Sequence, residues 1–407
     1  MFDVIVVGGG AAGLMAASTA AGLNKRTLLI EKMSRTGRKI LITGKGRCNV
    51  TNNCDRDAVL KNTVSNPKFL YSAIENFTPQ DTMEFFERNG VELKTERGNR
   101  VFPTSDKSMD IADALINSCK KNGVKVLTDT VLSLIVENGE IKGVETALQG
   151  QIFASSVIVA TGGLSYSKTG STGDGYKFAK AVGHSVTPLR ASLVGLKTVG
   201  EECKKMQGLS LKNTALTLKD KNNDKVIYSD MGEMLFTHFG ISGPMVLSAS
   251  AYVTDNPQNY YVTLDLKPAL SFEKLDERIS RDFSENINKD FSNSLSGLLP
   301  RAMIDVIIEK SGIAPDKKVN QITKEERQRL CALLKDFKIE ISSREDIESA
   351  IITAGGVNTR EINPKTMQSK LVNGLFFAGE VIDVDACTGG FNLQIAFSSG
   401  YTAGFYA

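Results

Sequence analysis

Three glycines near the start of the chain have the spacing of a phosphate-binding turn. Gly8, Gly10 and Gly13 form the pattern Gly-x-Gly-x-x-Gly after the apolar stretch FDVIVV (2–7) and at the start of an expected small-residue helix, 11–23. In such a turn the first glycine permits the tight bend, the second lets a pyrophosphate approach the backbone, and the third lets helix and strand pack closely. The N-terminus of the helix adds free N–H groups and a positive dipole end.

An acidic residue stands where a ribose-binding carboxylate is expected. The stretch RTLLIEK (26–32) predicts a second buried strand, and Glu31 lies near its end, 18 residues past Gly13. A carboxylate at this point accepts hydrogen bonds from the ribose hydroxyls of an adenosine. It also disfavours a 2′-phosphate, so we do not expect NADP in this site.

Later glycine turns favour FAD over NAD as the bound dinucleotide. ATGG (160–163) and AGE (378–380) follow two further buried strands, and TGGFN (388–392) comes next along the chain. Backbone approaches spread over the whole chain fit a long ligand that lies extended through the domain, as FAD does. The sequence has no second Gly-x-Gly-x-x-Gly, so we expect the flavin to exchange electrons directly with a substrate, or with NAD(P)H bound only transiently.

The order of elements predicts an α/β fold. A strand–turn–helix–strand opening argues for a doubly wound parallel sheet of the Rossmann type. Asn138-Gly139, between two β-like stretches, predicts a type I′ hairpin and hence a β-meander attached to that sheet.

The order of these stretches along the chain predicts one FAD-binding domain made of both chain ends, 1–189 and 350–407. The module between them, 190–349, reads as β-rich at 190–268 and 337–349 and helical at 271–336.

Composition excludes several classes of protein. The chain has 407 residues, is 41% hydrophobic and 23% charged, and carries a net charge of +3, so a nucleic-acid binder is not the default. Its six cysteines form no Cys-x-x-Cys pair, which argues against a zinc site or a disulfide framework. No apolar stretch approaches the roughly 20 residues of a membrane span. The chain opens without a signal-like segment, so we expect no membrane association and a cytoplasmic location.

Four blocks of this sequence resemble a known flavoprotein family. The likeness is to the BaiN-like or aminoacetone-oxidase-like FAD-dependent oxidoreductases, also called HI0933-type flavoproteins. The blocks are DVIVVGGGAAGLMAA (3–17), GRKILITGKGRCNVTN (37–52), GEMLFTHFGISGP (232–244) and GLFFAGEVIDVDACTGGFNLQIAFSSGYTAG (374–404). The resemblance runs nearly end to end and implies an FAD-binding domain with an inserted β-barrel-like and helical module. It does not carry the identity of the substrate.

The resemblance also implies which residues contact FAD. Arg38 and Lys39 are expected near its adenosine and phosphates, Glu380 near the ribityl or phosphate region, and Val131 at the adenine. The loop around Arg47 is expected beside the isoalloxazine, and the helix N-terminus near Gly390 below its N1–C2=O edge. The full expected set is Gly8, Gly10, Ala11, Ala12, Gly13, Glu31, Lys32, Arg38, Lys39, Gly44, Gly46, Arg47, Cys48, Asn49, Val131, Ala160, Thr161, Gly162, Gly379, Glu380, Gly389, Gly390, Asn392 and Leu393.

Flavin chemistry requires little from the protein beyond position, charge and access. His238, in FTHFGISGP, is the candidate proton shuttle, while His184 follows a predicted helix end and suggests a capping or surface role. Cys48 and Cys387 stand beside expected flavin-contacting glycines, but neither has a partner thiol at x-x spacing, so packing is the better interpretation. We expect no metal.

We therefore predict a hydride transfer between flavin N5 and a small organic substrate, at the interface of the two modules. One version oxidises an amine or keto compound with O₂, and the other reduces an activated C=C bond with NAD(P)H. The alternative is a flavin-bearing nucleic-acid-binding or RNA-modifying protein, which the near-neutral charge argues against. The substrate, the redox partner and the oligomeric state stay open.

Overall fold

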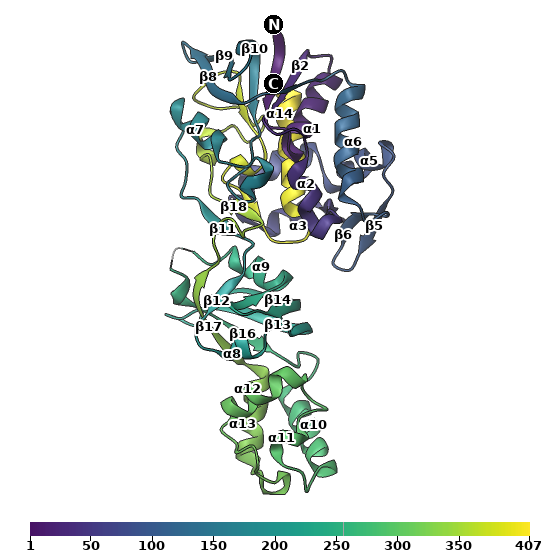
Figure 1. The fold of residues 1–407 in the computed structure, drawn as a ribbon, viewed down its shortest axis with the longest axis vertical. Helices are drawn as coiled ribbons and strands as arrows, with labels where there is room; N and C mark the ends of the chain where they lie inside the picture. The colour runs from purple at the N-terminus through teal and green to yellow at the C-terminus, as the bar shows by residue number, and fades with distance from the viewer. Residues whose placement is uncertain (255) are drawn as a thin grey trace. The chain divides into compact units, whose positions relative to one another are not determined.

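The chain divides into two units in a computed structural model that describes residues 1–254 and 256–407 (Figure 1). The first unit contains both chain ends, Met1–Ser192 and Asp346–Ala407, and the second is the inserted segment Leu193–Glu345. The inserted unit begins three residues later than the predicted boundary and ends four residues before it. The chain thus leaves the first unit once and returns to it.

A mainly parallel sheet forms the centre of the first unit. Its β-branched strands are buried because helices cover them, as a parallel sheet requires. The order β7-β2-β1-β10-β9-β8, with β19 also paired to β10, matches the predicted doubly wound sheet with a meander. The strands are β1 (Phe2–Val7), β2 (Thr27–Glu31), β7 (Lys125–Thr128), β8 (Val131–Glu137), β9 (Glu140–Thr146), β10 (Gly150–Val159) and β19 (Leu375–Phe377).

The meander forms as its turn residues predict. Asn138 has a φ of +52° and Gly139 a φ of +78°, the left-handed pair that a type I′ turn needs. The turn joins β8 to β9 in an antiparallel hairpin, and β9 continues into β10. Strand β10 then runs parallel to β1, so one long strand belongs to both parts of the sheet.

Two helices from opposite ends of the chain pack side by side next to this sheet. In Figure 1 the purple α1 (Ala11–Gly22) lies along the yellow α14 (Phe391–Tyr406). Both helices are buried almost all round, so neither shows an amphipathic pattern. The other helices of this unit are α2 (Arg38–Ile42), α3 (Arg56–Lys61), α4 (Tyr71–Asn76), α5 (Pro79–Arg88), α6 (Ser108–Lys121) and α7 (Asp174–Ala181).

Small two-stranded ladders complete the first unit. Strand β11 (Arg190–Ser192) pairs with β18 (Ile352–Ala354), and β4 (Thr63–Ser65) pairs with β20 (Asp385–Ala386). A three-stranded sheet has the order β3-β6-β5. Its strands are β3 (Thr51–Asn52), β5 (Leu93–Glu96) and β6 (Arg100–Pro103).

The inserted unit contains a closed barrel, in agreement with the expected β-barrel-like module. Its strands follow one another in the order β12-β15-β14-β13-β16-β17. They are β12 (Leu196–Thr198), β13 (Ser210–Asp220), β14 (Val226–Phe236), β15 (Gly240–Ser242), β16 (Tyr260–Asp265) and β17 (Phe337–Arg344), with the short helices α8 (Glu202–Lys205) and α9 (Pro244–Ser250) between strands.

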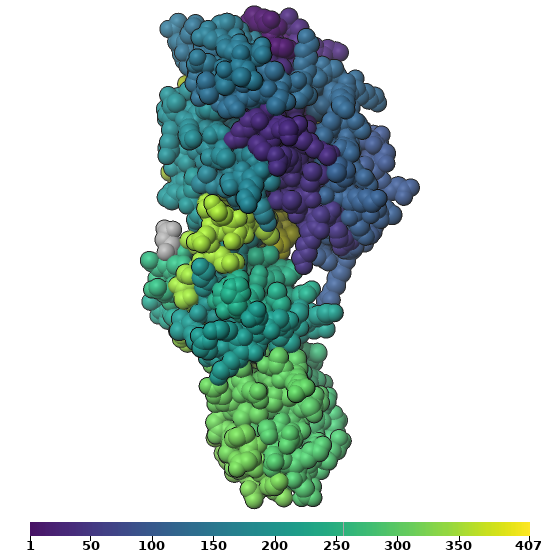
Figure 2. All heavy atoms as spheres, in the orientation of Figure 1, coloured from purple at the N-terminus to yellow at the C-terminus, as the bar shows by residue number. Residues whose placement is uncertain are grey.

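The helical part of the inserted unit lies where the sequence predicts it, within 271–336. One apolar cluster, which includes Leu264 and Leu330, connects it to the barrel. Figure 2 shows these helices as light-green atoms gathered next to the teal barrel. A capping box between Thr323 and Glu326 starts the last helix. The helices are α10 (Phe272–Glu285), α11 (Phe291–Ser294), α12 (Arg301–Ser311) and α13 (Lys324–Lys335). Among the described residues, no helix combines the length and apolar character needed to cross a membrane.

His184 lies in the interior, and the suggestion of a surface role was wrong. It is 3% exposed, its Nδ1 lies 3.2 Å from Glu361 Oε2, and its Nε2 lies 2.8 Å from Ser369 Oγ. The ring edge also packs on Phe377. Both ring nitrogens are satisfied by residues almost two hundred positions away, which no local pattern signals.

Stability should fall in mild acid because of His184. Burial lowers its pKa and outweighs the opposing effect of Glu361. A depressed folded-state pKa gives stability that is present above the unfolded value, about 6.5, and is lost as the pH falls. We expect the melting temperature of the native chain to drop more between pH 7.5 and 5.5 than that of His184→Gln. Equal drops would contradict this assignment.

Candidate functional site

The turn between β1 and α1 places a different constraint on each of its three glycines. Gly8 has a φ of +102°, and a Cβ there would lie 2.6 Å from the carbonyl oxygen of Ala160. A Cβ at Gly13 would lie 1.8 Å from the carbonyl oxygen of Gly8. At Gly10 a Cβ would meet nothing within 4 Å. The space beside Gly10 is therefore open, as a turn that admits a pyrophosphate requires.

Glu31, the last residue of β2, is tied to the same turn. Its Oε2 accepts a hydrogen bond from the Gly9 N–H at 2.7 Å, and its Oε1 accepts one from the Met33 N–H at 2.8 Å. Both carboxylate oxygens are thus fixed next to the glycine turn. A carboxylate in this position is what an adenosine ribose needs.

Two residues predicted to contact the cofactor form an ion pair although they stand 341 positions apart. Lys39 Nζ lies 2.6 Å from Glu380 Oε2. Ser165 joins them, because its Oγ accepts from Lys39 Nζ at 2.8 Å and donates to Glu380 Oε1 at 3.0 Å. The Thr353 N–H donates to that same carboxylate oxygen at 2.8 Å. Sequence reasoning missed Ser165 and Thr353, because single hydroxyl residues carry no pattern.

Two further polar groups of the predicted set lack a partner. The Thr161 hydroxyl oxygen is buried without a hydrogen bond, and in the described part of the chain nothing pairs with the half-buried guanidinium of Arg38. A buried unsatisfied polar group costs about 1–3 kcal/mol. A dinucleotide would supply oxygens for both, since cations beside a pyrophosphate offset its charge. The residues present therefore fit FAD.

Three other predicted contacts lie on the strands and loops around this turn. Lys32 follows β2, and its charge is already paired, with Nζ 2.6 Å from Asp174 Oδ2. Val131 begins β8 and is 8% exposed. Ala160 follows β10, and its N–H donates to the Val7 carbonyl, which draws the loop towards the glycine turn.

The predicted loop from Gly44 to Asn49 has a tightly wound backbone. Positive φ values occur at Gly44 (+56°), Lys45 (+58°), Gly46 (+85°) and Cys48 (+59°). Left-handed lysine and cysteine are unusual, and such conformations cluster at functional sites. The Cys48 N–H donates to the Thr43 carbonyl at 3.0 Å and helps to hold this conformation.

Asn49 connects this loop to the start of α14. With its amide oriented to satisfy its neighbours, the side-chain nitrogen donates to the Val101 and Thr51 carbonyls, and the oxygen accepts from the Gly390 N–H at 3.0 Å. Gly390 is closely confined, since a Cβ there would lie 2.4 Å from the carbonyl carbon of Thr51. Two motifs that the sequence keeps far apart therefore meet at one helix N-terminus.

The turn before α14 is held by hydrogen bonds between the Asn392 side chain and the backbone of the turn. Asn392 Nδ2 donates to the Ala386 carbonyl at 2.7 Å, and its Oδ1 accepts from the Ala386 N–H at 3.0 Å. Gly389 has a φ of +128°, which a side chain would resist. Leu393 lies in the first turn of the helix and is half-buried. The N-terminal N–H groups of α14 are thus presented from a rigid turn.

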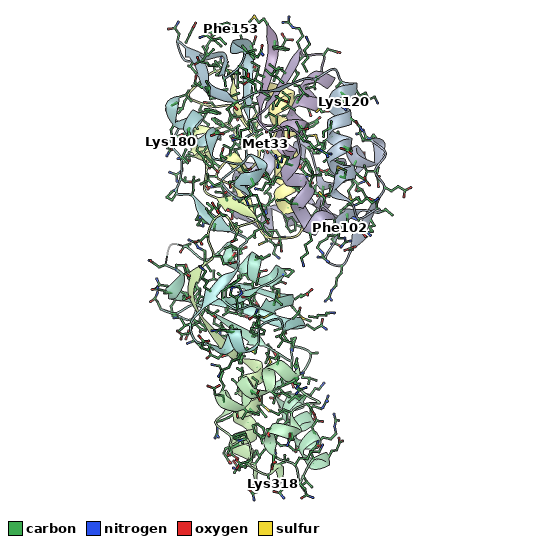
Figure 3. The ribbon with its side chains drawn as sticks, in the orientation of Figure 1. Met33, Phe102, Lys120, Phe153, Lys180 and Lys318 are labelled. Atoms are coloured by element: carbon green, nitrogen blue, oxygen red, sulfur yellow. The ribbon has the colours of Figure 1, made fainter. Side chains whose placement is uncertain are left out.

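The Arg47 guanidinium forms ion pairs within the protein. It binds Glu96 and lies 2.6 Å from Asp106, and Lys94 reaches the same Asp106 at 2.8 Å. The Arg47 guanidinium also stacks 4.2 Å above the ring of Phe102, labelled in Figure 3. Because two carboxylates already satisfy it, a contact with the cofactor would come from its backbone unless these pairs break.

The two cysteines next to the predicted flavin contacts are buried. Burial raises the pKa of the fully buried Cys48 to about 12, so it stays a thiol at neutral pH. Cys387 is 5% exposed. A thiol is a poor nucleophile, which agrees with the packing interpretation.

At Gly379 the backbone approaches α1 closely. Gly379 has a φ of +75°, its N–H donates to Ser399 Oγ at 2.9 Å, and a Cβ would lie 2.7 Å from the Cβ of Ala12. Gly162 is likewise left-handed, with a φ of +72°. His238 belongs to the inserted unit, where it is exposed in the turn between β14 and β15.

A glycine turn after the first strand, a carboxylate at the end of the second and a second glycine turn at α14 define an FAD-binding protein of the Rossmann type. The chain belongs to the family described as HI0933-like protein Rossmann domain, whose profile matches residues 2–406. It is therefore an FAD-dependent oxidoreductase, as the sequence resemblance implies.

Two curated relatives align over nearly the whole chain. The ribosomal RNA dihydrouridine synthase of Escherichia coli is 32% identical over 98% of this chain and 96% of its own length. The 3-dehydro-bile acid delta(4,6)-reductase of Clostridium scindens is 30% identical over 98% of this chain and 97% of its own length.

A solved structure shares the fold. The 3-ketosteroid delta1-dehydrogenase of Sterolibacterium denitrificans is similar over 99% of this chain and 98% of its own, with a TM-score of 0.55 and 13% identity. At that identity the likeness concerns the fold alone.

Proposed function

We propose that this protein reduces a C=C bond conjugated to a carbonyl group, with NADH or NADPH as the source of electrons. When bound, FAD supplies the chemistry of hydride transfer at its N5 atom. The chain's own residues bind and orient that cofactor: the open space at Gly10 for the pyrophosphate, Glu31 for the ribose, and the N-terminus of α14 for the negative charge of the reduced ring.

The observation that carries this proposal is the chemistry shared by two full-length relatives. One name is that of a dihydrouridine synthase and the other that of a delta(4,6)-reductase of a 3-dehydro bile acid. Both names describe addition of two hydrogens to a C=C bond next to a carbonyl. The substrates differ greatly in size, whereas the reaction is the same, so the reaction is the better inference for this chain.

The test follows NAD(P)H consumption by the purified holoprotein without oxygen. With cyclohex-2-enone or 1,4-androstadiene-3,17-dione as acceptor, we expect acceptor-dependent oxidation of NADH or NADPH and a product heavier by two hydrogens. A parallel assay in air tests the other reaction. There an oxidase would consume oxygen and release peroxide in the presence of an amine, without NAD(P)H. That result would reject the proposal in favour of oxidation by O₂.

A uracil base in RNA is the second candidate substrate. The names of the relatives from Escherichia coli and Haemophilus influenzae, 32% and 33% identical, favour it. Against it, residues 193–345 carry equal numbers of basic and acidic side chains, 22 of each, so the inserted unit has no excess of positive charge for a phosphate backbone. Ribosomal RNA from a strain lacking this gene, incubated with the protein and NADPH and digested to nucleosides, would reveal dihydrouridine if RNA is the substrate.

His238→Ala is expected to lower turnover while leaving FAD binding intact. The residue is an exposed imidazole of the inserted unit, and loss of one hydrogen-bond donor to an oxygen that gains negative charge slows a reaction by about 100-fold or more. The measurement is kcat with the best acceptor, together with the flavin content of the purified protein. Asn222→Ala, in another exposed turn of the inserted unit, is the control. Unchanged kcat would remove His238 from the mechanism.

A further inference from the structure

Asp385 is a fully buried carboxyl group with one oxygen left over. It lies on β20 and is 0% exposed. Its Oδ2 accepts a hydrogen bond from Ser192 Oγ at 3.0 Å, and Ser192 is itself 0% exposed. Its Oδ1 is buried and has no hydrogen-bond partner among the described residues. Each such group in a folded protein calls for an explanation, of which a catalytic role is one.

Arg190 is a second unsatisfied group directed at the same place. It stands two residues before Ser192 on β11, and side chains at i and i+2 of a strand project to the same face. Its Nε is buried without a hydrogen bond, and within residues 1–254 and 256–407 its guanidinium forms no ion pair. A half-buried arginine with a buried, unpaired Nε and a buried aspartate with an unpaired Oδ1 therefore lie near one another.

Burial raises the pKa of Asp385 above the usual range for an aspartate. The hydroxyls of Ser65 and Ser192 and the charge of Arg190 work in the opposite direction, and Asp383 adds to the increase. Arg190 and Asp383 are the charged groups that act on this carboxyl, and the paired strand β4 contributes only the Ser65 hydroxyl. Burial is the largest of these effects, so the net shift of the pKa is upward.

The cluster lies next to residues that are predicted to bind FAD, among them Glu380 and Asn392. Asp385 stands between Glu380 and Gly389 in the chain, and the next residue, Ala386, is held at both backbone atoms by Asn392. Thr353, on the partner strand of β11, binds Glu380. Ser65, which pairs with Asp385 across the β4–β20 ladder, is half-buried, whereas Asp385 itself is not exposed.

We propose that Asp385 is the proton donor of the reaction. In this proposal Arg190 stabilises the carboxylate that remains, and the Ser65 hydroxyl passes the proton to the substrate. This inference rests on the proposed function. Hydride addition brings an electron pair and a hydrogen to one carbon of the C=C bond, and the π electrons move towards the carbonyl. The other carbon then takes a proton from Ser65 Oγ, which takes one from Asp385. The carboxylate left beside Arg190 is reprotonated by water, and NAD(P)H is the reductant.

The decisive experiment separates the two halves of the catalytic cycle. Asp385→Asn keeps the shape of the side chain and removes its exchangeable acid proton. We expect NADPH to reduce the flavin at the native rate, whereas reoxidation by cyclohex-2-enone slows by about 100-fold and loses its pH dependence. Ser65→Ala should slow the same step. Asp113→Asn, an acid on α6 that pairs with Arg35 at the surface, is the matched control and should be near normal.

A second readout needs no activity. A carboxyl with a raised folded-state pKa gives stability that is present below its unfolded pKa and is lost as the pH rises through the folded value. The native apoprotein should therefore lose stability with rising pH, and Asp385→Asn should abolish that part of the loss.

Two results would overturn the proposal. One is reoxidation of Asp385→Asn at the native rate with an unchanged pH profile. The other is an apoprotein of this variant that is less stable at every pH with the native slope, because Asp385 would then be a structural anion paired with Arg190. If the native protein reduces no enone at all, the proposed function fails, and the stability measurement alone decides whether Asp385 holds a proton.

Discussion

Gly10→Val is expected to give a folded but colourless protein. Gly10 adopts extended φ and ψ of −82° and −168°, which valine tolerates, and a Cβ there meets no protein atom within 4 Å. The side chain would instead fill the space expected for the pyrophosphate. We expect FAD affinity to fall by at least about 100-fold, or ~2.7 kcal/mol, while apoprotein stability changes by less than about 1 kcal/mol.

The measurement is titration of the apoprotein with FAD, followed by flavin fluorescence. Gly297→Val is the matched control, because Gly297 is exposed in the inserted unit and a Cβ there also meets nothing within 4 Å. That variant should bind FAD normally. A yellow Gly10→Val protein with native flavin content would show that the pyrophosphate does not lie against this turn.

Gly400→Ala is expected to destabilise the first unit by about 3 kcal/mol, near the upper end for overpacking of a well-packed interior. A Cβ at Gly400 would lie 2.4 Å from the carbonyl oxygen of Ala12, a backbone atom that cannot move without shifting α1. Gly404 meets the Ala16 carbonyl in the same way one turn later, at 2.3 Å. The two helices are thus in near contact along one line.

The sign of the change in stability of Gly400→Ala distinguishes a close contact between α1 and α14 from an effect of helix propensity. In an exposed helix, replacement of glycine by alanine would stabilise the protein by about 1 kcal/mol. Urea denaturation of the apoprotein measures the difference, with Gly404→Ala as a second variant. A more stable Gly400→Ala protein would mean that α1 and α14 do not approach closely. The prediction that both chain ends form one domain would then fail as well.

Local patterns predicted the parts of this protein whose conformation depends on neighbouring residues. The glycine turn after β1, the carboxylate at the end of β2 and the left-handed Asn138-Gly139 hairpin follow from backbone sterics within a few residues. The family resemblance extended this to Lys39 and Glu380, which the structure brings together.

Contacts between distant residues could not be read in the same way. No sequence spacing relates the side chains that contact His184, which are Glu361 and Ser369. The same holds for Ser165 and Thr353, which hold Glu380. It also holds for Asp385 and its neighbours Ser192 and Arg190.

Neighbouring residues are enough to predict a dinucleotide-binding turn at the start of the chain, and the order of the elements predicts that the two chain ends share one domain. Which polar groups lack partners depends on the complete fold, because sheet order and helix packing bring distant residues beside each donor and acceptor. The free space at Gly10 and the unused oxygen of Asp385 are both of this kind.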